Sequence, residues 1–215
     1  MTVGRPGKRS AVEAEQTRDA ILQAALNTFS ELGFDGASVR DIASHTGVSH
    51  GVLRHHFGSK EDLWKHVMEH VFDHFSSHML PLIEGAVSGD KSLALTNFHS
   101  VVSGFIDISL THPSYARLLI SETRGGGERA EYCHARFAGL HTAISELFDL
   151  AKAQSPALQS HSNDSFFYCL MSLTYFRIAF PGMGPELNFP VANGYPSAKD
   201  MILDILFADS SVSNR

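Results

Sequence analysis

Three helices that each begin at a serine start in quick succession, and this crowding constrains the fold more than any other feature of the chain. Ser38 and Ser59 are each followed three residues later by an aspartate, Asp41 and Asp62. This is the capping-box pattern, in which each side chain accepts the other residue's free backbone N–H. Ser49 can cap the helix between them alone. The pattern predicts a compact unit of short helices.

Two short turns separate these helices, Thr46-Gly47-Val48 and Phe57-Gly58. A helix, a short glycine-containing turn and a second helix form the arrangement whose second helix enters the major groove of DNA. Turned at about 100° per residue, the helix over 49–56 directs some side chains inward and others outward. The inward set is Val52, Leu53 and, less cleanly, His56, and the outward set is His50, Gly51, Arg54 and His55.

The rest of the chain also has helical periodicity, so the predicted fold class is all-α. A helix over 17–32 should end at Gly33 in a left-handed conformation, and a long helix from Ser59 should end or kink at Pro81. Further helices are expected over 90–111, 114–123, 128–154, 163–180 and 197–208, with a Pro/Gly-rich loop over 181–196. No strand or hairpin pattern is present.

The net charge of −6 is distributed unevenly along the chain. Residues 1–60 carry seven Lys/Arg against six Asp/Glu, whereas residues 61–215 carry ten against seventeen. The asymmetry indicates that the N-terminal part faces a polyanion. Two cysteines, no signal peptide and no stretch that approaches the ~20 apolar residues of a membrane span predict a reduced, cytoplasmic protein without a membrane partner.

At these residues the chain resembles the TetR-type bacterial transcriptional regulators. The resemblance covers about the first 65 residues and is carried by Ala20, Ala25, Phe29, Gly33, the run 38–43, Gly47-Val48-Ser49 and the run 56–63. One departure is Arg54, because such proteins usually have tyrosine there. A guanidinium at this position pairs with guanine or binds phosphate.

The resemblance implies a division into a DNA-binding domain over 1–60, with an arm over 1–16, and a ligand-binding and dimerisation domain over 61–215. The segment GRPGKR at 4–9 is either a basic arm that enters the minor groove or a solvated tail. The expected partner is a double-stranded DNA operator. The residues expected to contact it are Arg40, Ser49, His50, Gly51, Arg54, His55, His56 and Lys60.

Aromatic residues recur at helical spacing in the C-terminal part, and most of them must form its core. The resemblance implies that the helices matching 59–154 and 163–180 enclose an apolar pocket for a small-molecule effector. The expected ligand-binding residues are Phe98, His99, Phe105, Phe137, His141, Tyr168, Met171 and Tyr175. For each of them, core packing is the competing interpretation.

The last two helices, 163–180 and 197–208, resemble the pair through which such regulators form homodimers. Their apolar face would consist of Met171, Leu173, Phe176, Ile202, Ile205 and Leu206. A two-fold dimer suits DNA reading, because one short recognition helix offers too few base contacts for a unique site.

A row of histidines, His66, His70, His74 and His78, recurs every four residues on the long helix. Adjacent pairs at this spacing can chelate a transition metal, but no further ligand cluster accompanies them, so we expect no metal. A half-exposed face, or pH-sensitive packing against a neighbouring helix, is the favoured interpretation.

Catalytic signatures are missing from the sequence. The neighbours Cys133 and His134 point about 100° apart on a helix and cannot form a nucleophile–base pair. We therefore expect no enzyme and no cofactor. The resemblance implies a ligand-responsive repressor, released from a palindromic operator by a small apolar or aromatic effector. Two alternatives stay open: a DNA-binding regulator without a small-molecule pocket, and a metal-sensing helical bundle.

Overall fold

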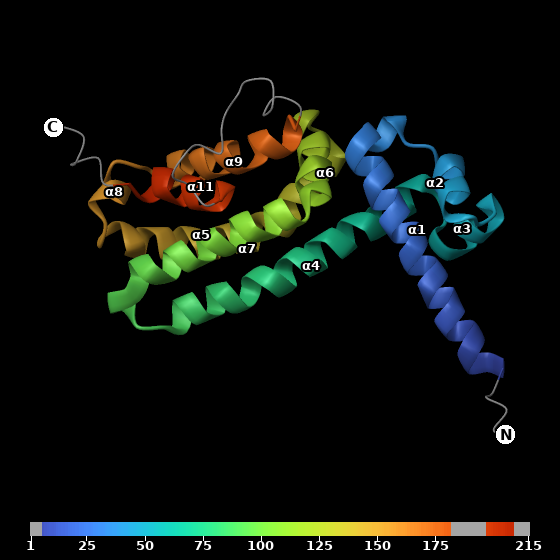
Figure 1. Cartoon of the computed structure of the whole chain (residues 1–215), viewed down its shortest axis with the longest axis horizontal. Coiled ribbons are helices and arrows are strands. Elements are labelled where there is room, and N and C mark those ends of the chain that lie inside the picture. Colours follow the sequence, from blue (N-terminus) through green and yellow to red (C-terminus); the bar gives the residue numbers. More distant parts are fainter. Residues whose placement is uncertain (1–5, 182–196, 209–215) are drawn as a thin grey trace.

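The computed structural model describes residues 6–181 and 197–208, and its regular elements there are all helical, as expected. A small unit of three helices lies at one end, and a longer bundle extends from it (Figure 1). The predicted loop over 181–196 lies, apart from Pro181, outside the described residues. The helices are α1 Pro6–Gly36, α2 Val39–Thr46, α3 His50–Phe57, α4 Lys60–Ser88, α5 Ala94–Thr111, α6 Pro113–Arg124, α7 Glu128–Lys152, α8 Pro156–Gln159, α9 Asn163–Ala179 and α11 Ala198–Phe207, with a 3₁₀ turn at Lys91–Leu93.

Two predicted helix boundaries are wrong. Helix α1 begins at Pro6 rather than at residue 17, so most of the expected arm over 1–16 is helical. Helix α4 continues through Pro81 to Ser88. A proline in a helix leaves the carbonyl four residues earlier without its N–H partner. Both Pro81 and Ser77, which carries that carbonyl, are exposed, so water can hydrate the gap.

The predicted serine caps are present in the structure. The Oγ of Ser38 accepts the N–H of Asp41 at 3.4 Å, and that of Ser49 accepts the N–H of Val52 at 3.2 Å. At Ser59 the capping box is complete, since its own N–H donates to the Asp62 carboxylate at 2.9 Å. The Ser59 hydroxyl, which donates to the same carboxylate at 2.6 Å, and the Ser59 N–H together hold the pKa of Asp62 below its usual value. The local sequence therefore determines where α2, α3 and α4 begin.

The described residues form two hydrophobic cores that share α4. The first half of α4 packs with α1, α2, α3 and α6, around side chains such as Trp64 and Phe29. The second half packs with α5, α7, α9 and α11, around Phe98, Phe148 and Phe166. Helix α6 lies between the three-helix unit and the bundle (Figure 1). It contacts α1 on one side and α7 and α9 on the other.

Helix α5, with the 3₁₀ turn before it, is long and apolar enough to span a membrane by length and composition, which corrects the expectation that no segment reaches this limit. It is the central helix of the bundle and contacts α4, α7, α9 and α11. Val101, Val102 and Ile106 are buried against these neighbours. A core helix passes the same test, so its apolar character is explained by packing.

Candidate nucleic-acid interface

Helices α2 and α3 form a tight helix-turn-helix held by a small core. Ile42 and Leu53 are fully buried, one from each helix. The turn between the helices begins at Gly47, whose φ of 70° and ψ of 14° are left-handed. Here a side chain would meet the steric penalty of a positive φ. The N–H of Val48 donates to the Ala43 carbonyl at 3.1 Å and closes the end of α2.

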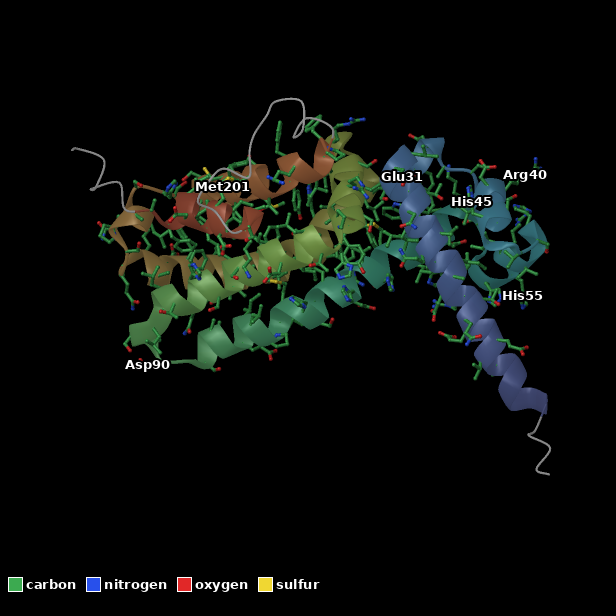
Figure 2. All side chains as sticks on the ribbon, viewed as in Figure 1. Glu31, Arg40, His45, His55, Asp90 and Met201 are labelled. Atoms are coloured by element: carbon green, nitrogen blue, oxygen red, sulfur yellow. The ribbon has the colours of Figure 1, made fainter. Side chains whose placement is uncertain are left out.

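The side of α3 that faces away from this core is exposed at the outer end of the molecule. His50, Gly51, Arg54 and His55 are all exposed, as predicted from the helical spacing. Figure 2 places the labelled Arg40 and His55 at this end, far from Asp90 and Met201. Ser49, which precedes α3, and Arg40 of α2 are exposed as well. We call the six residues together the reading face: Arg40, Ser49, His50, Gly51, Arg54 and His55.

The reading face offers hydrogen-bond donors to a polyanion. Helix α3 contains no Asp or Glu, and among the described residues neither α3 nor Ser49 takes part in an ion pair. The Arg54 guanidinium therefore has no intramolecular carboxylate to compete with DNA. Gly51 leaves room for a backbone to approach, since a Cβ there would meet nothing closer than the Ser49 Oγ at 3.7 Å.

The structure contradicts the expected inward orientation of Val52, and it leaves His56 and Lys60 half-buried. Val52 is 39% exposed and does not join the core, because α3 is anchored by Leu53 and Phe57 four residues apart. His56 is half-buried and its ring lies 6.2 Å from that of Phe57. Lys60 is half-buried, and its ammonium lies 4.5 Å from the Phe34 ring centroid and donates to the Asp35 carbonyl at 3.5 Å. In this conformation Lys60 joins α4 to the end of α1.

Four of the expected ligand-binding residues lie in or against the core of the bundle. Phe98 is fully buried, and its ring centroid lies 5.2 Å from that of Phe166. Phe137 lies 5.5 Å and Phe105 6.0 Å from Phe75. Tyr175 stacks on Phe105 at 5.9 Å. Burial raises the pKa of the Tyr175 phenol to about 12, and a hydrogen bond with Ser109 partly offsets this effect.

The other four expected ligand-binding residues are exposed. Tyr168 is 75% and Met171 37% exposed, both on the outer side of α9. They do not line the interior, because the buried stripe of α9 runs through Phe166, Leu170, Thr174 and Ile178. His99 and His141 are exposed on α5 and α7, each in contact with an aromatic ring at its edge. The eight residues thus do not form one site.

Two surface hollows stand out among the described residues. One of about 570 Å³ lies between the start of α4 and the start of α7, and it is lined by Glu61, Lys65, Gly126, Gly127, Glu128 and Arg129. The other, of about 460 Å³, lies between α5 and α11 and is lined by His99, Asp200, Leu203, Asp204 and Phe207. Of the expected ligand-binding residues, His99 alone borders one of these two hollows.

The histidine row on α4 meets different neighbours at each turn. His66 contacts Phe57 of α3 at 5.4 Å, whereas His74 contacts His112 and Tyr115 at 4.7 and 5.5 Å between ring centroids. Among the described residues, no group of three or more His, Cys, Asp or Glu is arranged to hold a metal ion. The periodicity of one helix could not reveal the contact with His112, because this residue comes from the α5–α6 junction.

Comparison with known proteins agrees with this geometry. Residues 21–67 match the model of the bacterial regulatory proteins of the tetR family. The HTH-type transcriptional regulator UidR of Escherichia coli strain K12 is 33% identical over 143 residues, which are 62% of this chain and 63% of UidR. The HTH-type transcriptional repressor NicS of Pseudomonas putida strain KT2440 is 29% identical over 120 residues, 56% of this chain and 54% of NicS. The matches therefore span less than two thirds of these relatives' length.

Among solved structures, the whole fold is similar to that of AibR, described in complex with isovaleryl coenzyme A and operator DNA. The TM-score is 0.68, with 18% sequence identity over 89% of this chain and 98% of that one. At 18% sequence identity, this similarity shows that the fold is shared and nothing more.

The helix-turn-helix and its exposed donor face on an all-α body define a protein of the helix-turn-helix class. The family match over residues 21–67 and the named relatives confirm the expected resemblance: the chain is similar to the tetR family of bacterial regulatory proteins, and the matched residues include its helix-turn-helix. The relatives are named as transcriptional regulators and not as enzymes, which agrees with the expectation of no enzymatic activity.

Proposed function

We propose that the protein is a cytoplasmic, homodimeric transcriptional repressor that reads a palindromic double-stranded DNA operator with α3. The observation that carries the proposal is the reading face, which combines exposed donors with the absence of carboxylates on α3. Base edges and phosphates present acceptors to such a face. Residues 1–60 form the DNA-binding domain, with residues 1–16 as its arm, and residues 61–215 carry the remaining functions.

The proposed dimer interface lies on the outer side of α9 and α11. Large apolar side chains are exposed there, and they are Tyr168, Met171, Phe176, Phe180 and Ile205. Large exposed apolar side chains on two helices in contact are typical of an interaction surface. Ile202 and Leu206, which the sequence assigned to this face, are buried within the protomer, so the seam is narrower on α11 than expected.

The proposed effector is a small apolar or aromatic molecule that enters the aromatic core between α4, α5, α7 and α9. Phe98, Phe105, Phe137 and Tyr175 are the residues that we assign to its wall. In the described structure Phe105 and Phe137 pack against Phe75, and Tyr175 stacks on Phe105. Phe98 packs against Phe148 and Phe166. The effector must therefore displace side chains as it binds. The structural neighbour AibR is described in complex with isovaleryl coenzyme A and operator DNA, which supports the proposal that a protein of this fold binds both a small molecule and DNA.

The close packing of this core also favours a second candidate function, a DNA-binding regulator whose bundle binds no small molecule. A core filled by Phe98, Phe148 and Phe166 leaves no space for a ligand. The regulator would then respond to a protein partner or to protein concentration.

The first experiment is selection of operator sequences from random double-stranded DNA with the purified full-length protein. We expect a palindromic consensus whose half-sites lie about one helical turn or a multiple of it apart. Enrichment of no sequence over the starting pool would refute the DNA-binding proposal.

A thermal-shift screen against metabolites then separates the two candidates. A ligand at 100 times its dissociation constant stabilises the folded state by about 2.7 kcal/mol. An effector must also lower operator affinity, because a ligand that binds both states equally shifts nothing. The filled-bundle regulator predicts that no compound does both.

A further inference from the structure

Three aromatic side chains meet where α4 passes the junction between α5 and α6. His74 comes from α4, His112 is the residue between α5 and α6, and Tyr115 lies in the first turn of α6. The His112 ring stacks on Tyr115 at 4.9 Å, and His74 packs edge-on against both rings, 4.7 Å from His112. We call these three residues the α4–α6 joint.

One imidazole nitrogen of the joint lacks the polar contact that such an atom usually makes when it is buried. The Nδ1 atom of His74 is buried and has no hydrogen-bond partner among the described residues. Tyr115 is 7% exposed. Two imidazoles in such a setting pack well when neutral, but two positive charges at this separation repel in a medium less polar than water.

The position of the joint connects the bundle to the DNA-binding domain. Tyr115 belongs to the same core as the three-helix unit, together with Leu118 of α6. Helix α6 also approaches α1 closely, since a Cβ on Gly33 would lie 2.9 Å from the Ser121 Oγ. Because packed interfaces move between discrete arrangements rather than deform continuously, a displacement of α6 must be transmitted to α1.

We propose that the α4–α6 joint is a proton-operated switch, in which protonation of the His74–His112 pair separates α4 from the start of α6 and weakens DNA binding. Its effect on DNA rests on the proposed function, whereas the movement of the joint does not. The sequence left two interpretations of the histidine row, a half-exposed face or pH-sensitive packing, and the contact between His74 and His112 favours the second at this turn.

The charges around the joint determine the direction of the effect. Burial lowers the pKa of His112 from its usual 6.5, and the neighbouring His74 and His78 lower it further. One turn earlier, burial also lowers the pKa of His70, and His74 acts in the same direction.

Helix α1 places two opposite charges near His70: Asp19 favours its protonation, as does Asp73 of α4, while Arg18 opposes it. Among the described residues, no group of α7 or α9 contributes to the lowered pKa of His112. A lowered pKa in the folded state means that the packed joint is favoured above about pH 6.5 and is weakened as the pH falls through the lower folded value.

The chain's single tryptophan reports on the transmitted movement. Trp64 is 1% exposed and lies between α1 and α7, 6.4 Å from Phe34 and 5.5 Å from Tyr132. We expect its emission to shift to longer wavelength between about pH 7.5 and about pH 5.5, while far-UV circular dichroism stays unchanged. All buffers contain a chelator, so a bound metal does not contribute.

The decisive variant is His74→Phe, which keeps an aromatic ring in the joint and removes its proton site. We expect the variant to lose the emission shift and to raise the pKa of His112 measured by NMR titration, because a like charge is gone. His134→Gln is the matched control, since His134 is exposed on α7 and away from the joint. His112→Phe tests the other half of the pair if His74→Phe does not fold.

In operator titrations at these two pH values, we expect the wild type to lose at least about five times more affinity than His74→Phe loses. A change of about fivefold is the lower end of typical allosteric coupling. The proposal is overturned if wild-type Trp64 emission does not change with pH, or if His74→Phe responds as the wild type does. The emission and NMR measurements contain no DNA, so their failure is distinct from a failure to bind an operator.

Discussion

The replacement Arg54→Ala tests how the reading face recognises DNA. Arg54 is exposed near the centre of α3, and within the described residues its guanidinium forms no ion pair or hydrogen bond. Its removal should therefore leave the stability of the fold within about 0.5 kcal/mol of the wild type. A loss of DNA-binding free energy larger than this is then caused by the lost contact between Arg54 and DNA.

The size of the expected loss follows from the contact and from the symmetry. A bidentate contact to guanine contributes about 1–3 kcal/mol of discrimination. A dimer presents two copies of Arg54 to half-sites far enough apart for their effects to add, so the loss is about 2–6 kcal/mol per operator. This corresponds to roughly 30-fold to 10⁴-fold weaker binding.

The assay is fluorescence anisotropy on the selected operator and on a scrambled duplex, each at several salt concentrations. Base reading predicts a large loss on the operator and a small one on the scrambled duplex. The control Arg40→Ala, exposed on α2, should weaken both duplexes alike if Arg40 contacts phosphate. If Arg54→Ala also weakens both equally and reduces the salt slope by about one per lost contact, Arg54 binds phosphate and base reading is refuted.

Three further replacements test the body of the protein. Leu53→Ala, at a fully buried site, should lower the free energy of unfolding by about 2–5 kcal/mol in urea titrations, and a value below about 1 would contradict its role as the anchor of α3. Ile205→Glu, 53% exposed in the protomer, should yield monomers in sedimentation because the proposed seam cannot bury an unpaired charge; an intact dimer places the seam elsewhere. Gly104→Phe, where even a Cβ meets Leu82 of α4, should push α4 from α5 and weaken operator binding about 5- to 150-fold, and unchanged affinity in a folded dimer would count against coupling through α4.

Local rules were sufficient to predict the three-helix unit from the sequence. A serine cap needs only the backbone N–H groups of the next turn, so Ser38, Ser49 and Ser59 could be assigned without knowledge of the tertiary fold. Gly47 was equally predictable, because its turn requires a positive φ. These are the elements that position the reading face.

Boundaries and burial that depend on distant neighbours were not predictable in the same way. The continuation of α4 past Pro81 depends on which side of the helix faces water, and the exposure of Val52 depends on how α3 sits on Leu53 and Phe57. The conformation of Lys60 was not predictable for the same reason, since the Phe34 ring and the Asp35 carbonyl that it contacts belong to α1.

The interior of the bundle shows the same limit most clearly. Helical spacing identifies an apolar stripe but not the partner that covers it, whether another helix, a second protomer or a ligand. On α11 the stripe divides, because Ile202 is buried inside the protomer while Ile205 three residues later is exposed. On α9, Tyr168 carries an aromatic ring as Phe166 does, yet one is exposed and the other fills the core. Residue type therefore could not separate buried from exposed positions, because burial depends on the direction of each side chain on its helix.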